Sequence, residues 1–267
     1  MTKRILLTLT LTLIALFTLT ACKSDKEEAN VIKIGATPVP HAEILELIKP
    51  ILEADGITLE IVEFTDYVTP NLALSEGEID ANFFQHIPYM DSFAKEHGVE
   101  LVSVGAVHVE PLGLYSKKFK DLSEITEGST IAIPNDPTNE GRALLLLQAN
   151  GLIKLSADVT LEATEKDIIE NTLKLKFEPI DAAQLPRSLD DVDAAIINTN
   201  YALEADLNPL EDALVLEGSE SPYANVLTVT PDRADDELIL KVLKALQSEE
   251  VRAFIEEKYS GAVVPAF

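Results

Sequence analysis

Aromatic side chains are concentrated in one short stretch of this sequence. Residues 80–93, DANFFQHIPYMDSF, contain three of the nine Phe, one of the six Tyr and one of the four His, in a chain without Trp. Phe84, His86 and Tyr89 surround an expected strand-to-helix turn, and a spacing of three places His86 and Tyr89 on one face of the helix start. Taken alone, these residues can form either a wall of the core or a wall of a binding pocket.

A second stretch has the residue types of an anion-binding site. Residues 131–152, IAIPNDPTNEGRALLLLQANGL, run from a strand through a loop into a helix, and we expect Thr138 or Asn139 to cap the first turn. Arg142 lies on that turn, where the helix macrodipole disfavours a cation by up to about 1 kcal/mol. We expect either a neighbouring acid such as Glu140 or a bound anion to offset this cost. A carboxylate fits a single arginine, which can bind it through two hydrogen bonds, whereas a phosphate site is typically built on a glycine-rich loop.

Catalytic chemistry has little support in the sequence. The four histidines, His41, His86, His97 and His108, do not show the spacing of zinc ligands. The chain has no G-x-S-x-G motif, and its single cysteine, Cys22, lies near the N-terminus. We therefore predict a protein that is not an enzyme and that has no catalytic residue, no metal site and no cofactor.

The N-terminus has the pattern of an export signal followed by a lipid anchor. A basic start and a short apolar run precede the tetrapeptide Leu-Thr-Ala-Cys, which resembles a bacterial lipobox. The apolar run is shorter than the roughly 20 residues that cross a bilayer. We predict a signal peptide over residues 1–21, lipidation of Cys22, and a flexible tether over residues 22–30. Acyl chains on Cys22 would hold the protein on the cell membrane, facing the periplasm or the cell exterior.

The charge of the chain excludes some partners. Its formal net charge is −25 at pH 7, from 46 Asp and Glu against 21 Lys and Arg. Binding to nucleic acid, or electrostatic binding to anionic lipid, requires a basic surface. We therefore expect no nucleic-acid partner and a membrane attachment that depends on the lipid anchor.

Strands and helices alternate from residue 31 onward, which predicts the α/β class with parallel sheets covered on both faces. Apolar periodicity and Gly/Pro punctuation predict extended segments at 31–37, 57–64, 79–84, 100–116, 129–134, 175–180, 193–198 and 225–231. The same signals predict helices at 42–56, 71–77, 87–98, 140–151, 185–191 and 235–259.

Two segments repeat one pattern weakly. LSEGEIDANFFQH, residues 74–86, and RSLDDVDAAIINTN, residues 187–200, each run from a helix end through Asp-Ala into an apolar strand that finishes on polar residues. Two similar α/β lobes would show such a pattern. Ligands of these sheets bind outside the carboxyl ends of the strands, where His86 and Asn198 lie.

Several segments together resemble the NlpA family of methionine-binding lipoproteins. The resemblance extends from Leu19 to Phe267, and it is carried by the lipobox and the following segments in order: FTDYVTPNLALSEGEIDANFFQHIPYM, IPNDPTNEGRALLLLQANGLIKL, AAQLPRSLDD, AAIINTNYA and SPYANVL. It implies a two-lobed periplasmic-binding-protein fold of the type II kind, with two mixed or parallel sheets flanked by helices and a two-strand hinge. It also implies a role in an ABC importer of methionine.

The resemblance assigns the site residues. Around the thioether it implies Tyr67, Phe84, His86 and Tyr89 from the first lobe. For the zwitterionic head group it implies Asn139 and Arg142, together with Asn198 and Asn225. Asn200, two residues after Asn198, is an alternative for that position, and Glu140 adds a negative charge beside Arg142.

The sequence thus predicts an extracytoplasmic lipoprotein that captures L-methionine, with D-methionine as a further candidate, between two lobes. Lobe 1 is expected to comprise residues 31–112 and 226–267, and lobe 2 residues 113–225. The expected partners are the permease of an ABC importer and its ATPase. Two alternatives stay open: a binding lipoprotein for another small amino acid or peptide, and a surface adhesin or antigen that keeps the fold without a ligand.

Overall fold

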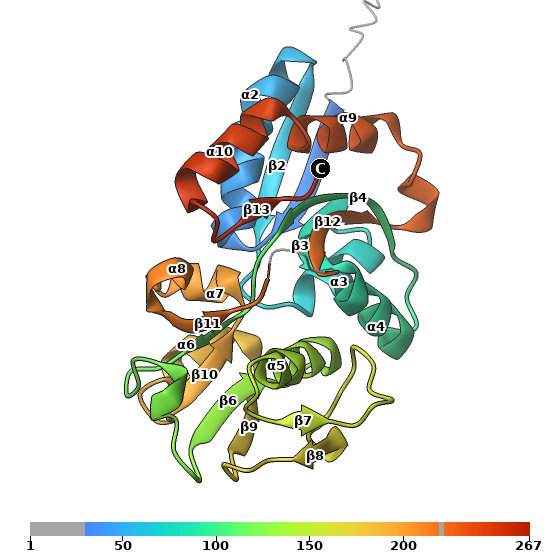
Figure 1. The fold of residues 1–267 in the computed structure, drawn as a ribbon. Helices are drawn as coiled ribbons and strands as arrows, with labels where there is room; N and C mark the ends of the chain where they lie inside the picture. The colour runs from blue at the N-terminus through green and yellow to red at the C-terminus, as the bar shows by residue number, and fades with distance from the viewer. Residues whose placement is uncertain (1–29, 219–221) are drawn as a thin grey trace, which may run out of the picture. The chain divides into compact units, whose positions relative to one another are not determined.

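The structure is a computed structural model that describes residues 30–218 and 222–267 (Figure 1). The predicted signal peptide, the lipidation of Cys22 and all but the last residue of the predicted tether lie outside the described residues. The chain divides into a unit Met1–Asn30 and a folded unit Val31–Phe267. Within the described ranges, no helix is both long enough and apolar enough to cross a membrane.

The larger sheet combines strands from the two ends of the folded unit. Its six strands lie in the order β13-β4-β12-β3-β1-β2. β1 and β3 are parallel, whereas β12 runs antiparallel to both β3 and β4, so the sheet is mixed. The strands are β1 (Asn30–Ala36), β2 (Ile57–Glu63), β3 (Ala81–His86), β4 (Val102–Val109), β12 (Ala224–Val229) and β13 (Val264–Pro265).

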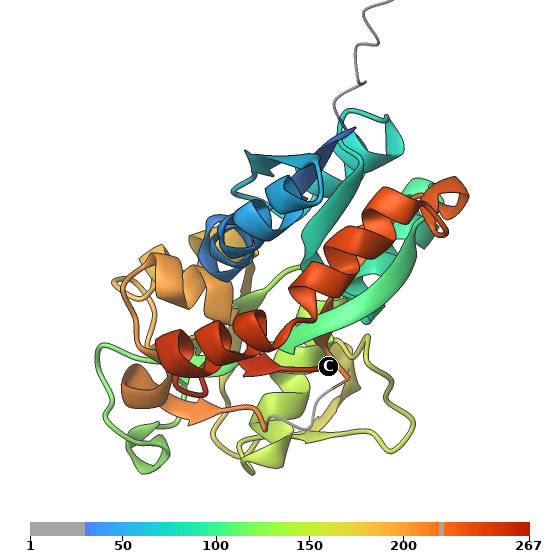
Figure 2. The same ribbon diagram turned by 90° about the horizontal axis from the view of Figure 1, so that it is seen from above.

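Helices from both ends of the unit share one core with this sheet. The apolar face of α2 buries Ile44, Ile48 and Leu52 against side chains from α9, α10 and the sheet. Figure 2 shows α2 close to the two C-terminal helices, which the packing confirms. The other face of β3 packs on α3 and α4 through Phe84, and β3 is therefore buried on both faces. The helices are α2 (Glu43–Ala54), α3 (Thr69–Ser75), α4 (Ile87–His97), α9 (Glu237–Leu246) and α10 (Glu249–Tyr259), with a π-helical turn at Pro38–Ala42.

The smaller sheet has five strands in the order β11-β5-β10-β6-β9. β10 is central, and its sequence Ala-Ala-Ile-Ile has no polar residue because both of its faces are buried. Ala194 and Ile196 pack with α5 on one side, while Ala195 and Ile197 pack with α6 and α7 on the other. The strands are β5 (Gly113–Tyr115), β6 (Thr130–Pro134), β9 (Lys176–Ile180), β10 (Ala194–Ile197) and β11 (Ala213–Leu216).

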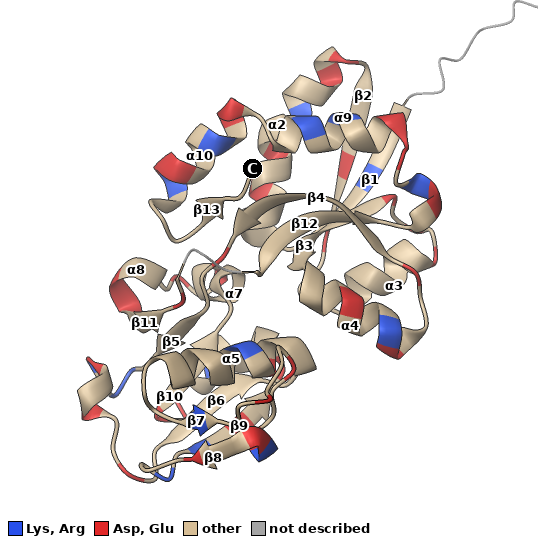
Figure 3. Ribbon diagram, turned by 45° about the vertical axis from the view of Figure 1, so that its right-hand side comes forward, with Lys and Arg blue, Asp and Glu red and all other residues tan. Residues whose placement is uncertain are grey.

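Helices and a two-stranded sheet complete this part of the chain. The helices are α5 (Pro137–Ala149), α6 (Leu185–Ser188), α7 (Thr199–Glu204) and α8 (Pro209–Asp212), and β7 (Lys154–Leu155) pairs with β8 (Ile168–Glu170). Single 3-10 turns occur at Leu122–Glu124, Glu165–Asp167, Ala182–Gln184 and, near the larger sheet, Pro231–Arg233. Acidic residues occur on helices beside the larger sheet, such as α4 and α10, and beside the smaller sheet, such as α8 (Figure 3).

The chain passes between the two sheets twice. It leaves the larger sheet after Val109 and enters the smaller one at Gly113, and it returns between Leu216 and Ala224. Two mixed α/β sheets with helices on their faces, joined by two crossing segments, form a two-lobed fold. This confirms the fold class predicted from the sequence.

The C-terminal helix differs from its prediction. The apolar pattern predicts one helix over 235–259, but the structure has two helices separated at Gln247 and Ser248. Ser248 has extended backbone angles, and its Oγ accepts a hydrogen bond from the Val251 N–H, so it caps a new helix. The sequence Ser-Glu-Glu at 248–250 is a start signal inside a continuous helical periodicity, and the prediction passed over it.

Candidate ligand-binding site

One cavity between the sheets contains all eight residues that the sequence predicts for the site. It encloses about 340 Å³ of space free of protein atoms, part of it continuous with solvent. The cavity is lined by Tyr67, Phe84, Gln85, His86, Tyr89, Glu110, Asn139, Arg142, Asn198, Thr199, Asn200 and Asn225. Which of these residues contact a ligand stays a prediction.

The aromatic residues of the first motif serve both the core and the cavity. Phe83 packs in the main core, edge-on to His41 and His108, and Phe93 packs behind Tyr89. Phe84 and Tyr89 line the cavity. Because adjacent residues of a strand face opposite sides, Phe83 and Phe84 divide between the two roles.

Three rings form one wall of the cavity. The ring centroid of Tyr67 lies 5.9 Å from that of Phe84 and 5.7 Å from that of Tyr89, and Phe84 and Tyr89 are 6.2 Å apart. The hydroxyl of Tyr89 donates to the carbonyl of Tyr67 at 3.0 Å, and that of Tyr67 donates to Asn200 Oδ1 at 2.6 Å. Burial raises the pKa of the Tyr67 hydroxyl well above its ordinary value. The wall therefore presents uncharged rings to the cavity.

His86 connects two helix starts. It caps α4, because its Nδ1 accepts from the Tyr89 N–H at 3.1 Å. The proton of the neutral imidazole is then on Nε2, which donates to Asn139 Oδ1 at 3.2 Å. Burial, reinforced by the nearby positive charge of Arg142, lowers the pKa of His86 to about 3. His86 is therefore neutral at physiological pH.

Asn139 is held by contacts from both lobes. The cap of α5 is Asp136, not Thr138 or Asn139 as the sequence suggested, and Asp136 accepts from the N–H of Asn139 at 2.9 Å. Asn139 Nδ2 also donates to both oxygens of Asp136, and its Oδ1 accepts from Asn198 Nδ2 at 3.0 Å as well as from His86. The remaining amide oxygen of Asn198 is buried and has no donor within the described residues. A ligand N–H would satisfy it.

The partner of Arg142 is an acid that the sequence analysis did not select. Nε lies 3.1 Å from both carboxylate oxygens of Glu217, and Nη2 lies 2.5 Å from Oε2, so Glu217, not Glu140, balances the charge. Nη2 also donates to the carbonyl of Glu110 at 2.7 Å, and the guanidinium lies 4.3 Å from the ring centroid of Tyr223. The Nε–Nη2 edge of Arg142 therefore contacts Glu217, and the expected two-bond contact between Arg142 and a ligand carboxylate stays a prediction. The contacts of Arg142 with the described residues are made by Nε and Nη2, and none of them involves Nη1.

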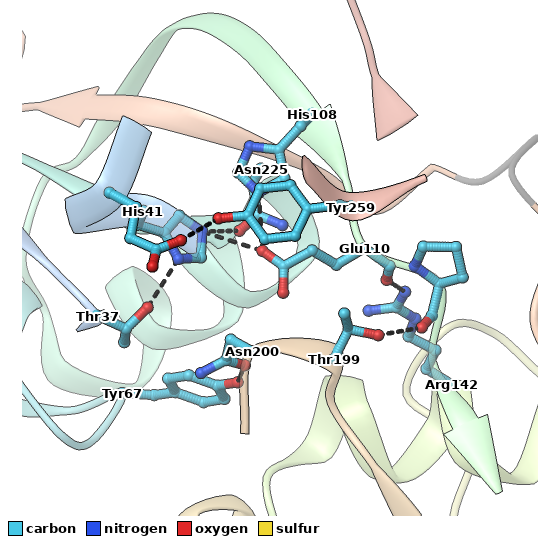
Figure 4. A network of polar contacts seen from close by, with 12 residues as sticks. Thr37, His41, Tyr67, His108, Glu110, Arg142, Thr199, Asn200, Asn225 and Tyr259 are labelled. Atoms are coloured by element: carbon cyan, nitrogen blue, oxygen red, sulfur yellow. Dashed lines mark hydrogen bonds and ion pairs between the residues drawn. The ribbon is translucent and has the colours of Figure 1, made fainter. Parts of the chain in front are cut away.

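Glu110 is the centre of a buried cluster beside the cavity (Figure 4). Its Oε1 accepts from His108 Nε2 at 2.8 Å and from His41 Nε2 at 3.1 Å. His41 Nε2 also lies 3.2 Å from Asn225 Oδ1, and His41 Nδ1 lies 2.7 Å from Thr37 Oγ1. Burial alone would raise the pKa of Glu110, but the two imidazoles lower it well below its ordinary value. The carboxylate is therefore ionised.

This cluster was missed because it is assembled by the fold. His41 lies 67 positions before His108 in the chain, and no ligand spacing joins them. A local signal was present, since His108 and Glu110 are two residues apart and so share one face of a strand.

The cluster has the residue types of a metal site but not the hydrogen bonds of one. The ligating atoms of His41, His108 and Glu110 lie within 4.8 Å of one another, the one such group found in the described ranges. A metal-bound imidazole usually donates through its second nitrogen, whereas His108 Nδ1 is buried without a partner. Both Nε2 atoms already contact Glu110. The geometry therefore fits a hydrogen-bonded carboxylate better than a metal centre.

A two-lobed α/β fold with a polar and aromatic cavity between its sheets is the architecture of solute-binding proteins. The model of the NlpA lipoprotein family matches residues 32–267. This chain belongs to the NlpA lipoprotein family, which confirms the resemblance seen in its motifs.

Known proteins are similar to this protein in sequence and structure over nearly the whole chain. The D-methionine-binding lipoprotein MetQ of Salmonella typhi is 45% identical over 255 residues, which cover 94% of each chain. The structure of a nutrient-binding protein from Burkholderia cenocepacia bound to methionine is similar with a TM-score of 0.86 and 48% identity, covering 88% of this chain and 100% of that one. Lipoprotein Tp32 from Treponema pallidum has a TM-score of 0.86 and 44% identity, covering 90% and 100% of the two chains.

The low pKa of His86 predicts a pH dependence of stability. In the unfolded chain a histidine takes up a proton near pH 6.5, whereas His86 in the folded protein does so at about 3. Between these values the unfolded state binds more protons, so the free energy of unfolding decreases as the pH falls. His86→Asn removes this pH-dependent contribution to the unfolding free energy, while the Asn Oδ1 can still accept a hydrogen bond from the Tyr89 N–H.

Urea denaturation at pH 7 and pH 5 measures this effect. From pH 7 to pH 5 the wild type should lose roughly 2 kcal/mol more of its unfolding free energy than His86→Asn does. An equal slope of the unfolding free energy against urea concentration would show that both proteins expose the same surface on unfolding. Equal losses in the two proteins would contradict a buried, neutral His86.

Proposed function

We propose that this protein is a lipid-anchored solute-binding protein that captures methionine between its lobes and delivers it to an ABC importer. The observation that carries the proposal is the joint presence, in one largely buried cavity, of a three-ring wall and a set of head-group partners. The names of its relatives, a D-methionine-binding lipoprotein and a methionine-bound nutrient-binding protein, support the same ligand.

The ring wall suits a thioether. A sulfur atom gains about 0.3–1.5 kcal/mol from each favourable aromatic contact. Tyr67, Phe84 and Tyr89 surround one part of the cavity with uncharged rings, and an unbranched side chain fits between rings more easily than a branched one. We infer that the methionine side chain lies against this wall, with His86 at its edge.

The polar side of the cavity suits an amino-acid head group. In our proposal, Arg142 meets the carboxylate through Nη1, because its other donors contact Glu217 and the Glu110 carbonyl. Asn139, Asn198 and Asn225 complete the surroundings of the head group, and all three line the cavity. Asn200 is engaged by the Tyr67 hydroxyl, which favours Asn198 as the asparagine that meets the ligand directly.

The two crossing segments suit a hinge. The sequence predicts lobe 1 as residues 31–112 and 226–267 and lobe 2 as residues 113–225. Because Ala224 and Asn225 lie in β12 of the larger sheet, we propose that these two residues also belong to lobe 1. Rotation of one lobe against the other would open and close the cavity, and closure would create the surface that a permease recognises. We infer binding and release of the ligand without chemical conversion.

The anchor belongs to the same proposal. Cys22 follows Leu-Thr-Ala and is the single cysteine of the chain. Acylation at Cys22 would hold the binding protein at the outer side of the cell membrane, at the permease.

Replacing one ring of the wall should reduce discrimination between methionine and leucine. We expect wild-type protein to bind methionine more tightly than leucine in calorimetric titrations of the twenty amino acids. Phe84→Leu keeps an apolar side chain but removes one sulfur–aromatic contact, so the preference should fall by about two- to tenfold.

Phe93→Leu is the matched control for this titration. Phe93 belongs to the same apolar cluster but does not line the cavity. It should therefore keep the wild-type preference. An unchanged preference in Phe84→Leu would show that the ring wall does not select the side chain, and absence of methionine binding by the wild type would disprove the proposed function.

Loss of the single thiol should abolish lipidation. In cells fed a tagged fatty acid, the wild-type protein should be labelled and fractionate with membranes. Cys22→Ser should be unlabelled, because a hydroxyl does not replace the thiol that receives the lipid. Equal labelling of the two proteins would exclude Cys22 as the attachment site.

A further inference from the structure

The carboxylate of Glu110 has one oxygen that faces the ligand space. Oε1 receives both imidazole contacts. Oε2 has no hydrogen-bond or ion-pair partner among residues 30–218 and 222–267. In Figure 4 the free oxygen points away from the imidazoles, toward the space beside Thr199 and Asn200. These two residues line the same cavity as Glu110.

This oxygen is an acceptor in need of a donor. Glu110 is only 6% exposed, and its side chain is ionised because the two histidines outweigh the effect of burial on its pKa. A buried charge whose hydrogen bonds are incomplete is costly. His41 and His108 satisfy Oε1 alone and hold the carboxylate in one orientation.

A second acceptor without a donor lines the same cavity. The amide oxygen of Asn198 is buried and has no partner among the described residues, because its Nδ2 points to Asn139. Two acceptors in one cavity, one of them charged, fit a ligand group that is cationic and carries several N–H bonds. An ammonium group has three donors and a full positive charge.

We propose that Glu110, held by His41 and His108, is the counter-ion of the ligand ammonium and makes a free amino group a requirement for binding. This inference rests on the proposed function, since it concerns the head group of the same ligand. It gives the principal electrostatic role on the amino side to a residue that no sequence motif selected.

The two charged residues proposed for the head group, Arg142 and Glu110, differ in the partners that they already have within the protein. Arg142 already has a carboxylate partner in Glu217 and a carbonyl partner in Glu110. Among the described residues, the side-chain partners of the Glu110 carboxylate are the two imidazoles, and both contact Oε1. Removing the amino group from the ligand should therefore weaken binding more than removing its carboxylate does.

Three probes test this with wild-type protein. Calorimetric titration should compare methionine, its hydroxy acid analogue with a hydroxyl in place of the amino group, and methylthiopropylamine, which lacks the carboxylate. Because the hydroxy acid leaves a buried carboxylate without its cation, it should bind at least about thirtyfold more weakly than methionine. Methylthiopropylamine should lose less affinity than the hydroxy acid.

A variant isolates the charge. Glu110→Gln keeps the side-chain shape and an oxygen for the two imidazoles but removes the negative charge. Its affinity for methionine should fall at least about thirtyfold, and its ratio of hydroxy acid to methionine dissociation constants should approach one. Glu60→Gln removes a charge from a half-exposed strand residue outside the cavity and should keep the wild-type ratio.

The outcomes separate this inference from the proposed function. If wild-type protein binds methionine and the hydroxy acid equally, Glu110 is not an ammonium receptor, although methionine binding stands. If it binds neither methionine nor methylthiopropylamine, both proposals fail. Should Glu110→Gln not fold, as judged by circular dichroism, the wild-type comparison of the three probes decides the question.

Discussion

The hydrogen bond between His86 and Asn139 joins the starts of α4 and α5, two helices that pack on different sheets. It requires a proton on His86 Nε2, whereas the cap that His86 makes on α4 requires an unprotonated Nδ1, and burial favours this neutral ring. Asn139 is oriented in turn by Asp136 and Asn198. The cavity thus depends on polar groups at strand ends that find partners across the two lobes instead of in water.

The need of buried polar groups for partners within the protein also explains how the charged side chains of the cavity are arranged. Arg142 and Glu110, which line the cavity, both have partners among the described residues: Arg142 contacts Glu217, and Glu110 contacts two imidazoles. Pairs of this kind cost desolvation energy, so they contribute little net stability, but they fix the directions of the remaining donor and acceptor atoms. A small zwitterion in the cavity would contact these remaining donor and acceptor atoms.

Much of the fold and of the site could be predicted from sequence. The long periodic helices, the apolar strands and the residues at the ends of β3 and β10 were predicted, because these signals are local and the motifs resemble a family that covers the chain. The partners of the charged groups could not be, since Glu217 is 75 positions from Arg142 and His41 is 69 positions from Glu110. Local reasoning also misplaced the cap of α5, where Asp136 lies just before a proline and outcompetes Thr138 and Asn139. Elements of two to six residues, such as β7 and α7, are too short to show a period.

The central claim is that methionine lies in this cavity with its side chain on the rings and its head group between Glu110 and Arg142. A crystal structure of the protein with methionine tests it most directly. The account predicts the sulfur among the rings of Tyr67, Phe84 and Tyr89, the ammonium within hydrogen-bond distance of Glu110 Oε2, and the carboxylate toward Arg142 Nη1. Methionine bound in the reverse orientation, or outside the cavity, would contradict it.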